Sequence, residues 1–152
     1  MPQRTPRIDV HTHMLERTAS EAGAPHSVVT GFGARSLPPP VPGSAQARAD
    51  RAGYDVELHI EMLDQLALDA EVLSSLTVMQ GTGWASPEQA HDLNRRVNDA
   101  IATWASEHPT RIVGSFTLPL PSRERSIAEL ERCAGELEMR VVQLPVASTA
   151  RI

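Results

Sequence analysis

The stretch RIDVHTHM, residues 7–14, decides the fold that we expect for this chain. Ile8 and Val10 are residues that favour β-strands, and side chains along a strand alternate between its two faces. Regular alternation places Ile8, Val10 and Thr12 on one face. The other face then carries only ionisable side chains, and these are Asp9, His11 and His13. Such a face is unusual for a hydrophobic core and typical of a metal site.

Two histidines separated by one residue on a strand can bind one metal ion together. The rise of a strand separates His11 and His13 by about 6–7 Å along the chain, and zinc accepts imidazole nitrogens at about 2.0–2.1 Å. Asp9 lies one step deeper, where it is expected to accept a hydrogen bond from the second nitrogen of a ligand or to fill an interior polar layer. The alternative is that both histidines are ordinary surface residues beside a loop. We predict His11 and His13 as metal ligands with Asp9 in support.

The composition bounds the class of protein. The chain has 152 residues, of which 41% are hydrophobic, so one domain with a core is expected. The net charge is −5 and no basic block stands out, which argues against a nucleic-acid partner. No apolar run approaches the length of about 18 residues that a membrane span needs, and no signal sequence is evident. Cys133 is the single cysteine, so no internal disulfide can form and a cytoplasmic location is expected.

Downstream of the first strand, an irregular stretch is followed by regular alternation of helices and strands. Residues 16–51 are rich in Ala, Gly, Pro and Ser and show no periodicity, so a long irregular loop is predicted. The predicted helices are Glu57–Leu68, a helix capped by Ser86 and running to about His108, and Ser126–Leu137. The predicted strands are Ala70–Val78, 111–120 and 139–146. The last helix is expected to be buried through Ile127, Leu130, Ala134 and Leu137.

The alternating order predicts an α/β fold with parallel strands and right-handed crossovers. In such folds the reactive groups lie at the carboxyl ends of the strands. His11 and His13 stand where the first strand ends, so their position and their chemistry agree.

The motif and four longer segments resemble one family. IDVHTHM is similar to the opening of amidohydrolase-superfamily enzymes. The segments resemble, more specifically, aminocarboxymuconate-semialdehyde decarboxylase and related aromatic-acid decarboxylases. They are EMLDQLALDAEVLSSLTVM (61–79), GWASPEQAHDLNRRVND (83–99), HPTRIVGSFTLPLPS (108–122) and AELERCAGELEMRVVQL (128–144). PHP-type phosphoesterases and TatD-type nucleases share the opening motif but do not account for FTLPL followed by LERC.

This resemblance implies a (β/α)8 TIM barrel that holds one divalent metal, zinc as our first expectation and manganese as the second, with His11 and His13 among the ligands. A further histidine ligand, an aspartate ligand and a catalytic histidine would lie in the second half of such a barrel. Residues 1–152 would then be the N-terminal part of one barrel domain, with only the first four β/α units present. Glu138 and Val141 stand where the family usually has glycines.

The resemblance also implies a small carboxylic-acid substrate. The family uses a loop arginine to hold the substrate carboxylate, a bidentate task that suits guanidinium, and Arg48 and Arg51 are the candidates. Trp84 follows the second strand and could line the substrate or pack the loop. The other histidines have no assigned ligand role, and we expect His59 and His91 to be solvated. Cys133 is expected to be a small core hydrophobe.

Three functional hypotheses remain open at this point. The first is a metal-dependent carboxy-lyase that decarboxylates a small unsaturated or aromatic acid without oxidation. The second is a metal-dependent hydrolase of an ester, lactone or amide on the same scaffold. The third is a truncated, non-catalytic fragment. A homodimer is expected from the resemblance.

Overall fold

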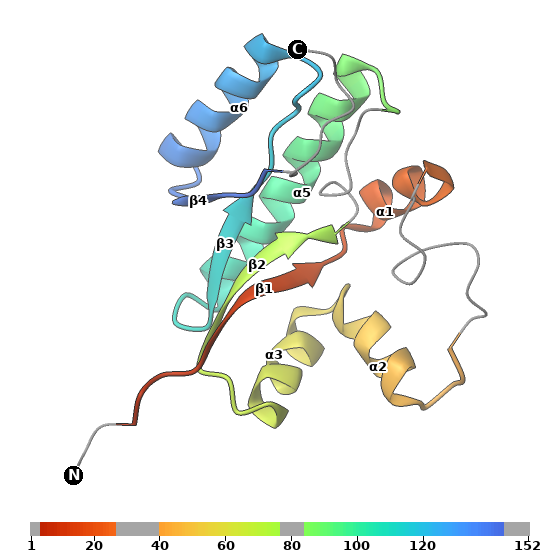
Figure 1. Ribbon diagram of the computed structural model, residues 1–152, viewed down its shortest axis with the longest axis vertical. Coiled ribbons are helices and arrows are strands. Elements are labelled where there is room, and N and C mark those ends of the chain that lie inside the picture. The colour runs from red at the N-terminus through yellow and green to blue at the C-terminus, as the bar shows by residue number, and fades with distance from the viewer. Residues whose placement is uncertain (1–3, 27–39, 77–83, 145–152) are drawn as a thin grey trace.

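The computed structural model describes residues 4–26, 40–76 and 84–144. Within these residues four parallel strands form one sheet in chain order. The strands are β1 (Ile8–Met14), β2 (Ala70–Ser75), β3 (Ile112–Phe116) and β4 (Val141–Val142). The helices are α1 (Arg17–Gly23), α2 (Ala45–Ala52), α3 (Val56–Gln65), α5 (Pro87–Glu107) and α6 (Arg123–Gly135), and a 3-10 turn, η1, spans Ala24–His26. Figure 1 shows the strands side by side, with α5 and α6 next to β3 and β4.

This arrangement confirms the predicted fold class. The connections between successive parallel strands pass through helices, as in the first four β/α units of a (β/α)8 barrel. The start of α5 is also as predicted. The Ser86 side chain accepts from the Gln89 N–H, the Gln89 side chain accepts from the Ser86 N–H, and Pro87 occupies the first turn.

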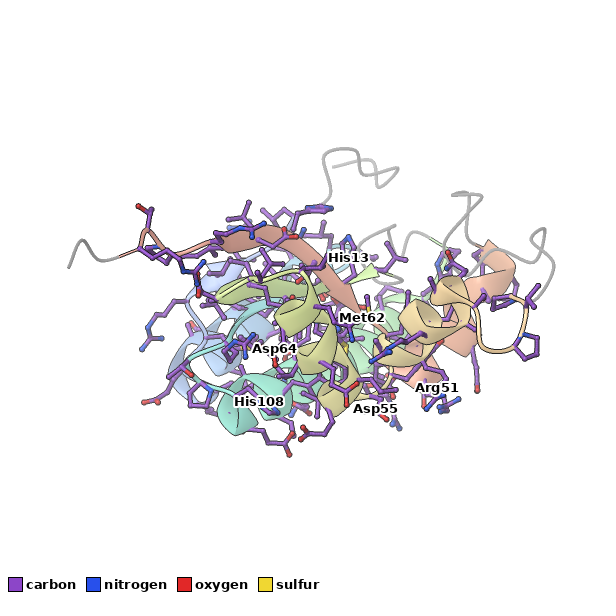
Figure 2. The ribbon with its side chains drawn as sticks, turned by 90° about the horizontal axis from the view of Figure 1, so that it is seen from below. His13, Arg51, Asp55, Met62, Asp64 and His108 are labelled. Atoms are coloured by element: carbon purple, nitrogen blue, oxygen red, sulfur yellow. The ribbon has the colours of Figure 1, made fainter. Side chains whose placement is uncertain are left out.

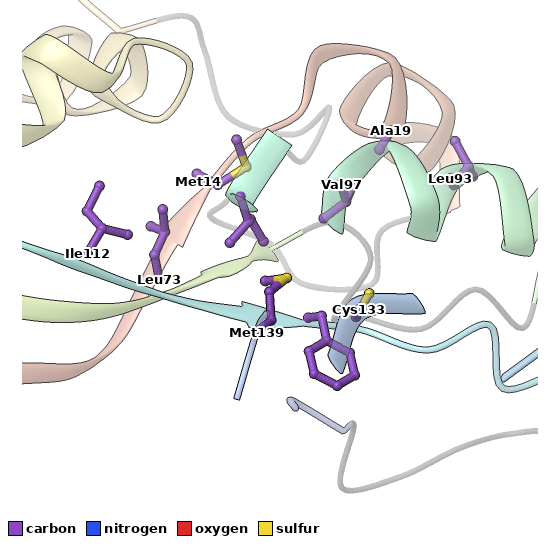
Figure 3. Packing of buried hydrophobic residues seen from close by; sticks show 10 residues of the cluster. Met14, Ala19, Leu73, Leu93, Val97, Ile112, Cys133 and Met139 are labelled. Atoms are coloured by element: carbon purple, nitrogen blue, oxygen red, sulfur yellow. The ribbon is translucent and has the colours of Figure 1, made fainter. Parts of the chain in front are cut away.

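The core lies between the sheet and α5. Leu93, Val97 and Ile101 face the sheet from α5, and the buried strand residues that meet them include Met14, Leu73, Ile112 and Phe116. Figure 3 shows this packing, with Cys133 and Met139 beside it. The approach of α5 to β3 is close, because a Cβ at Gly114 would lie 2.9 Å from Ile101 Cγ2. The absence of a side chain at Gly114 therefore allows α5 to pack this close to β3.

The structure corrects two predictions about elements. The stretch 16–51 is not irregular throughout, since it contains α1, η1 and most of α2. Glu16 and Ser44 cap α1 and α2 by accepting from the N–H groups three residues ahead. Both helices are too short to give a visible period. Residues 27–39 of the predicted loop lie outside the described part.

The second correction concerns the face of α6. Of the four residues expected to be buried, Ile127 and Leu130 are 46% and 40% exposed. Ala134 is partly buried, and Leu137 is partly buried against the core. The face that turns inward instead carries Glu129 and Cys133, which are 1% and 0% exposed. Glu129 is held there by hydrogen bonds from Asn98 and Arg132, and these bonds fix the rotation of the helix.

Cys133 is confirmed as a small core residue. Burial, with the neighbouring Glu129 carboxylate, raises the pKa of its thiol to about 12. None of the helices in the described ranges is long and apolar enough to cross a membrane.

Candidate metal centre

A bulge in β1 shapes the candidate site. Asp9 pairs with Glu71 and Thr12 pairs with Leu73, so three steps along β1 match two steps along β2. The extra residue shifts the alternation of side chains by one position. Asp9 therefore shares its face with Thr12 rather than with His13, which pairs with Ser74. The prediction that Asp9 and His13 lie on one regular face is wrong for this reason.

His11 and His13 nevertheless converge. Their Nε2 atoms lie 3.2 Å apart, and the rings meet edge to face with centroids 4.7 Å apart. Two nitrogens bound to one tetrahedral ion, each at about 2.0–2.1 Å, would be separated by about 3.3 Å. The observed separation therefore fits two ligands of one ion. The pair lies near the carboxyl end of β1, where the fold class places reactive groups.

His13 is the more enclosed of the two. Its Nδ1 lies 2.9 Å from Ser74 Oγ on the neighbouring strand. Burial, together with the nearby His11, lowers the pKa of His13 below its ordinary value. A lowered pKa favours the neutral imidazole, which is the form that binds metals.

Asp9 bonds to the backbone. Its Oδ1 accepts the N–H of His11 at 2.9 Å, across the bulge. The polar partner at the second nitrogen of His13 is Ser74, not Asp9. Support of the metal by the Asp9 carboxylate stays a prediction. The structure shows instead that Asp9 binds the backbone at His11.

In the described part of the chain, His11 and His13 are a pair of candidate ligands without a third beside them. Within residues 4–26, 40–76 and 84–144, no three side chains of the types His, Cys, Asp and Glu come together as a metal-binding group. A catalytic zinc usually has three protein ligands, so His11 and His13 by themselves are not a complete set.

The predicted substrate arginines lie on α2. Arg48 forms an ion pair with Glu61 of α3, with 2.7 Å between Nη2 and Oε2. Arg51 is exposed near the end of the helix, and Figure 2 draws it well apart from His13. The structure does not bring Arg51 to the histidine pair, and a substrate role for either arginine stays a prediction.

Trp84 has a partner that the sequence did not reveal. Its ring stacks on His26, with centroids 4.3 Å apart and an angle of 6° between the planes. Trp84 also packs against the core while partly buried. These contacts favour the packing role over the substrate-lining role, which remains untested. Residues 77–83, directly before Trp84, lie outside the described part.

Sequence reasoning missed a buried acid–base pair behind β2. His59 Nε2 lies 2.8 Å from Glu71 Oε1, and their side chains are 12% and 0% exposed. The expectation that His59 is solvated is wrong, because α3 turns it toward the sheet. A signal existed in the sequence: Glu71 is two residues before Leu73 and so shares its face of the strand, where a buried carboxyl group needs a polar partner. His91 Nδ1 is buried too, so His91 is not fully solvated either.

Comparisons with known proteins agree with this geometry. The amidohydrolase family model matches residues 8–150. The 2-amino-3-carboxymuconate-6-semialdehyde decarboxylase of Dictyostelium discoideum is 32% identical over 153 residues, which cover 93% of this chain and 40% of that protein. The gamma-resorcylate decarboxylase of Polaromonas sp. is 32% identical over 78 residues, which cover 51% of this chain and 24% of that protein.

A solved structure shows the same fold. The 5-carboxyvanillate decarboxylase of Novosphingobium aromaticivorans, complexed with manganese and 4-hydroxy-3-methoxy-5-nitrobenzoic acid, has a TM-score of 0.75 at 21% identity. The match covers 96% of this chain and 43% of that one. This chain thus spans about two fifths of the length of the Dictyostelium relative and of this structure. With nearly its whole length matched by the family model, the chain belongs to the amidohydrolase family.

Proposed function

We propose that this chain contributes two metal ligands, His11 and His13, to a divalent-metal-dependent decarboxylase of a small unsaturated or aromatic carboxylic acid. The observation that carries the proposal is the separation of 3.2 Å between their Nε2 atoms near the carboxyl end of β1. It is supported by the 32% identity to a decarboxylase over nearly the whole chain.

The reaction replaces a carboxylate by a proton. The bond between the ring or alkene carbon and the carboxylate breaks, carbon dioxide leaves, and the carbon takes up one proton. A divalent ion, when bound, supplies Lewis-acid stabilisation of charge on substrate oxygens. The part of His11 and His13 is to present neutral nitrogens from a rigid strand. The group that delivers the proton is proposed to lie outside the described residues.

Completion of the site requires further ligands. Of the histidines in the described ranges, His11 and His13 are the two whose Nε2 atoms converge, and no third ligand of the types His, Cys, Asp or Glu joins them there, whereas catalytic zinc sites usually have three protein ligands. We propose that the others come from residues beyond those described. Imidazole is a ligand that suits zinc, and manganese is present in the related 5-carboxyvanillate decarboxylase structure. Both ions are therefore the ones to test.

The test uses the complete gene product, stripped of metal and reloaded with Mn²⁺ or Zn²⁺. A panel of hydroxybenzoates and unsaturated dicarboxylates is assayed for carbon dioxide release, and esters, lactones and amides are assayed for hydrolysis. We expect metal-dependent release of carbon dioxide, reduced to background in His11→Ala and His13→Ala. His108→Ala is the matched control, because His108 lies at the end of α5 and pairs loosely with exposed Glu57. Hydrolysis without carbon dioxide release, or full turnover in the double variant, would contradict the proposal.

A further inference from the structure

Ser74 is a buried residue that contacts the candidate metal ligand His13. It is 1% exposed on β2, directly across from His13. Its Oγ makes two contacts of 2.9 Å, one to the carbonyl oxygen of Thr12 and one to Nδ1 of His13. Both partners belong to β1, next to the bulge. Ser74 therefore connects the backbone of β1, at Thr12, with the imidazole ring of His13.

The hydrogens in this arrangement can be assigned by elimination. A carbonyl oxygen only accepts, so the single hydroxyl hydrogen of Ser74 must point to Thr12. The Oγ atom can then serve His13 only as an acceptor, and the hydrogen in that contact must be on Nδ1. In a neutral imidazole the other nitrogen, Nε2, is then bare. This is the nitrogen that lies 3.2 Å from Nε2 of His11.

We propose that Ser74 is a positioning residue, which holds neutral His13 in the tautomer with its hydrogen on Nδ1 and presents Nε2 to a metal ion. The inference deepens the proposed function, because it rests on His13 being a ligand. A partner at the second nitrogen of a ligating histidine fixes the ring and its tautomer. In this chain the partner is the hydroxyl of Ser74, which itself donates a hydrogen bond to the backbone carbonyl of Thr12.

A consequence follows for His11 in the metal-free protein. Because Nε2 of His13 is bare, the hydrogen bond between the two rings must be donated by Nε2 of His11. The two histidines therefore differ in tautomer before metal binds. Binding through both Nε2 atoms requires a change of tautomer at His11 and none at His13.

The test is nitrogen NMR on the metal-free complete gene product, labelled with ¹⁵N-histidine and held above pH 8. Long-range proton–nitrogen spectra distinguish the nitrogen that bears the hydrogen, and His11→Ala and His13→Ala assign the signals. We expect the hydrogen on Nδ1 of His13 and on Nε2 of His11. In Ser74→Ala, His13 should lose its single tautomer, and titration with Mn²⁺ and Zn²⁺ should show affinity weakened by about 10- to 100-fold.

Ser75→Ala is the matched control. Ser75 is the next residue, is 0% exposed, and its Oγ has no hydrogen-bond partner among the described residues. It lies on the opposite face of β2, so its removal should change neither tautomer nor affinity. A hydrogen on Nε2 of His13 in the unmodified protein would overturn the proposal, even if Ser74→Ala failed to fold. A folded Ser74→Ala with unchanged tautomer and affinity would also overturn it. If the tautomers are as stated but no carboxylic acid is decarboxylated, the proposed function fails and the role of Ser74 stands.

Discussion

Asp9 holds the bulge on which His11 stands, through the hydrogen bond from the His11 N–H to its carboxylate. We predict that Asp9→Ala lowers the free energy of unfolding by about 0.5–1.5 kcal/mol, because that N–H loses its acceptor. Metal affinity should fall as well, since the spacing of the two Nε2 atoms depends on the bulge. Asp9→Asn keeps an acceptor oxygen and should stay close to the unmodified protein.

Chemical denaturation and metal titration of the complete gene product check the predictions for Asp9→Ala and Asp9→Asn. The two variants separate two roles for Asp9. If Asp9→Asn weakens metal binding as much as Asp9→Ala does, the charge of the carboxylate matters, and the backbone role is not the main one.

Glu138 adopts a backbone conformation that suits glycine. Its φ is +53°, in the left-handed region, which costs a residue with a Cβ about 1–2 kcal/mol. Glycine is free of that cost but loses more entropy on folding. We therefore predict that Glu138→Gly raises the free energy of unfolding by about 0.5–1 kcal/mol. This result would agree with the resemblance to a family that places glycine there.

Glu136→Gly is the control for this prediction, measured in the same denaturation experiment. Glu136 has φ −86° at the end of α6, where a side chain is tolerated, so glycine should destabilise. Stabilisation by both substitutions, or by neither, would show that the conformation at Glu138 is not the cause.

The sequence allowed the pairing of the two histidines to be predicted but not the contacts around them. The convergence of His11 and His13 was predictable because side chains two residues apart on a strand point the same way, and their role as ligands stays a prediction. The bulge depends on how β1 pairs with β2, and the contact of Ser74 with His13 depends on that same register. Spacing within one strand contains no information about the register of its neighbour.

At the scale of elements, a buried polar network ties β3 to α5 and α6. Asn98 of α5 donates to the Thr117 carbonyl at 3.0 Å and to Glu129 Oε1 at 2.7 Å, and it accepts from the Thr117 N–H at 2.9 Å. Burial by itself raises the pKa of Glu129, but hydrogen bonds from Arg132 and Asn98 outweigh it and hold the pKa below its usual value. The network fixes the chain as it leaves the carboxyl end of β3.

We predict that Asn98→Ala lowers the free energy of unfolding by about 2–4 kcal/mol, because the buried N–H and carbonyl of Thr117 lose their bonds to Asn98 and the buried Glu129 carboxylate keeps Arg132 but loses one donor. Denaturation of the complete gene product measures the change. Thr103→Ala, at an exposed position on the same helix, should stay within about 0.5 kcal/mol. Equal losses in both variants would contradict a special role for the network.

The predictability of the elements follows from how local their causes are. The start of α5 was predictable because its capping box and Pro87 lie within four residues. The orientation of α6 was not, because it depends on Asn98, which is 31 positions from Glu129. The two short helices after β1 were missed, since neither is long enough to show a repeating apolar face.

At the scale of the whole molecule, the sheet that the described residues form has two edges, with exposed apolar side chains near both. β1 and β4 are the outer strands. Ile8 and Val10 on β1 are 54% and 73% exposed, and Val142 and Leu144 at the other edge are 42% and 53% exposed. Unpaired strand edges with apolar side chains favour association.

We therefore predict that residues 1–152, produced alone, self-associate, bind Mn²⁺ and Zn²⁺ weakly, and release no carbon dioxide from carboxylic acids. Analytical ultracentrifugation, metal titration and the carbon dioxide assay check the three parts. A stable monomer with tight stoichiometric metal and turnover would contradict this prediction and would show that the chain supplies ligands beyond His11 and His13.

Pulsed electron paramagnetic resonance on the Mn²⁺-loaded complete gene product tests most directly whether His11 and His13 bind one divalent metal together. The measurement detects imidazole nitrogens coupled to the ion. We predict imidazole couplings in the unmodified protein and in the His108→Ala control. The couplings should weaken in each single variant, His11→Ala and His13→Ala. The double variant should lose the couplings from both histidines. Couplings that are unchanged in the double variant would contradict the account.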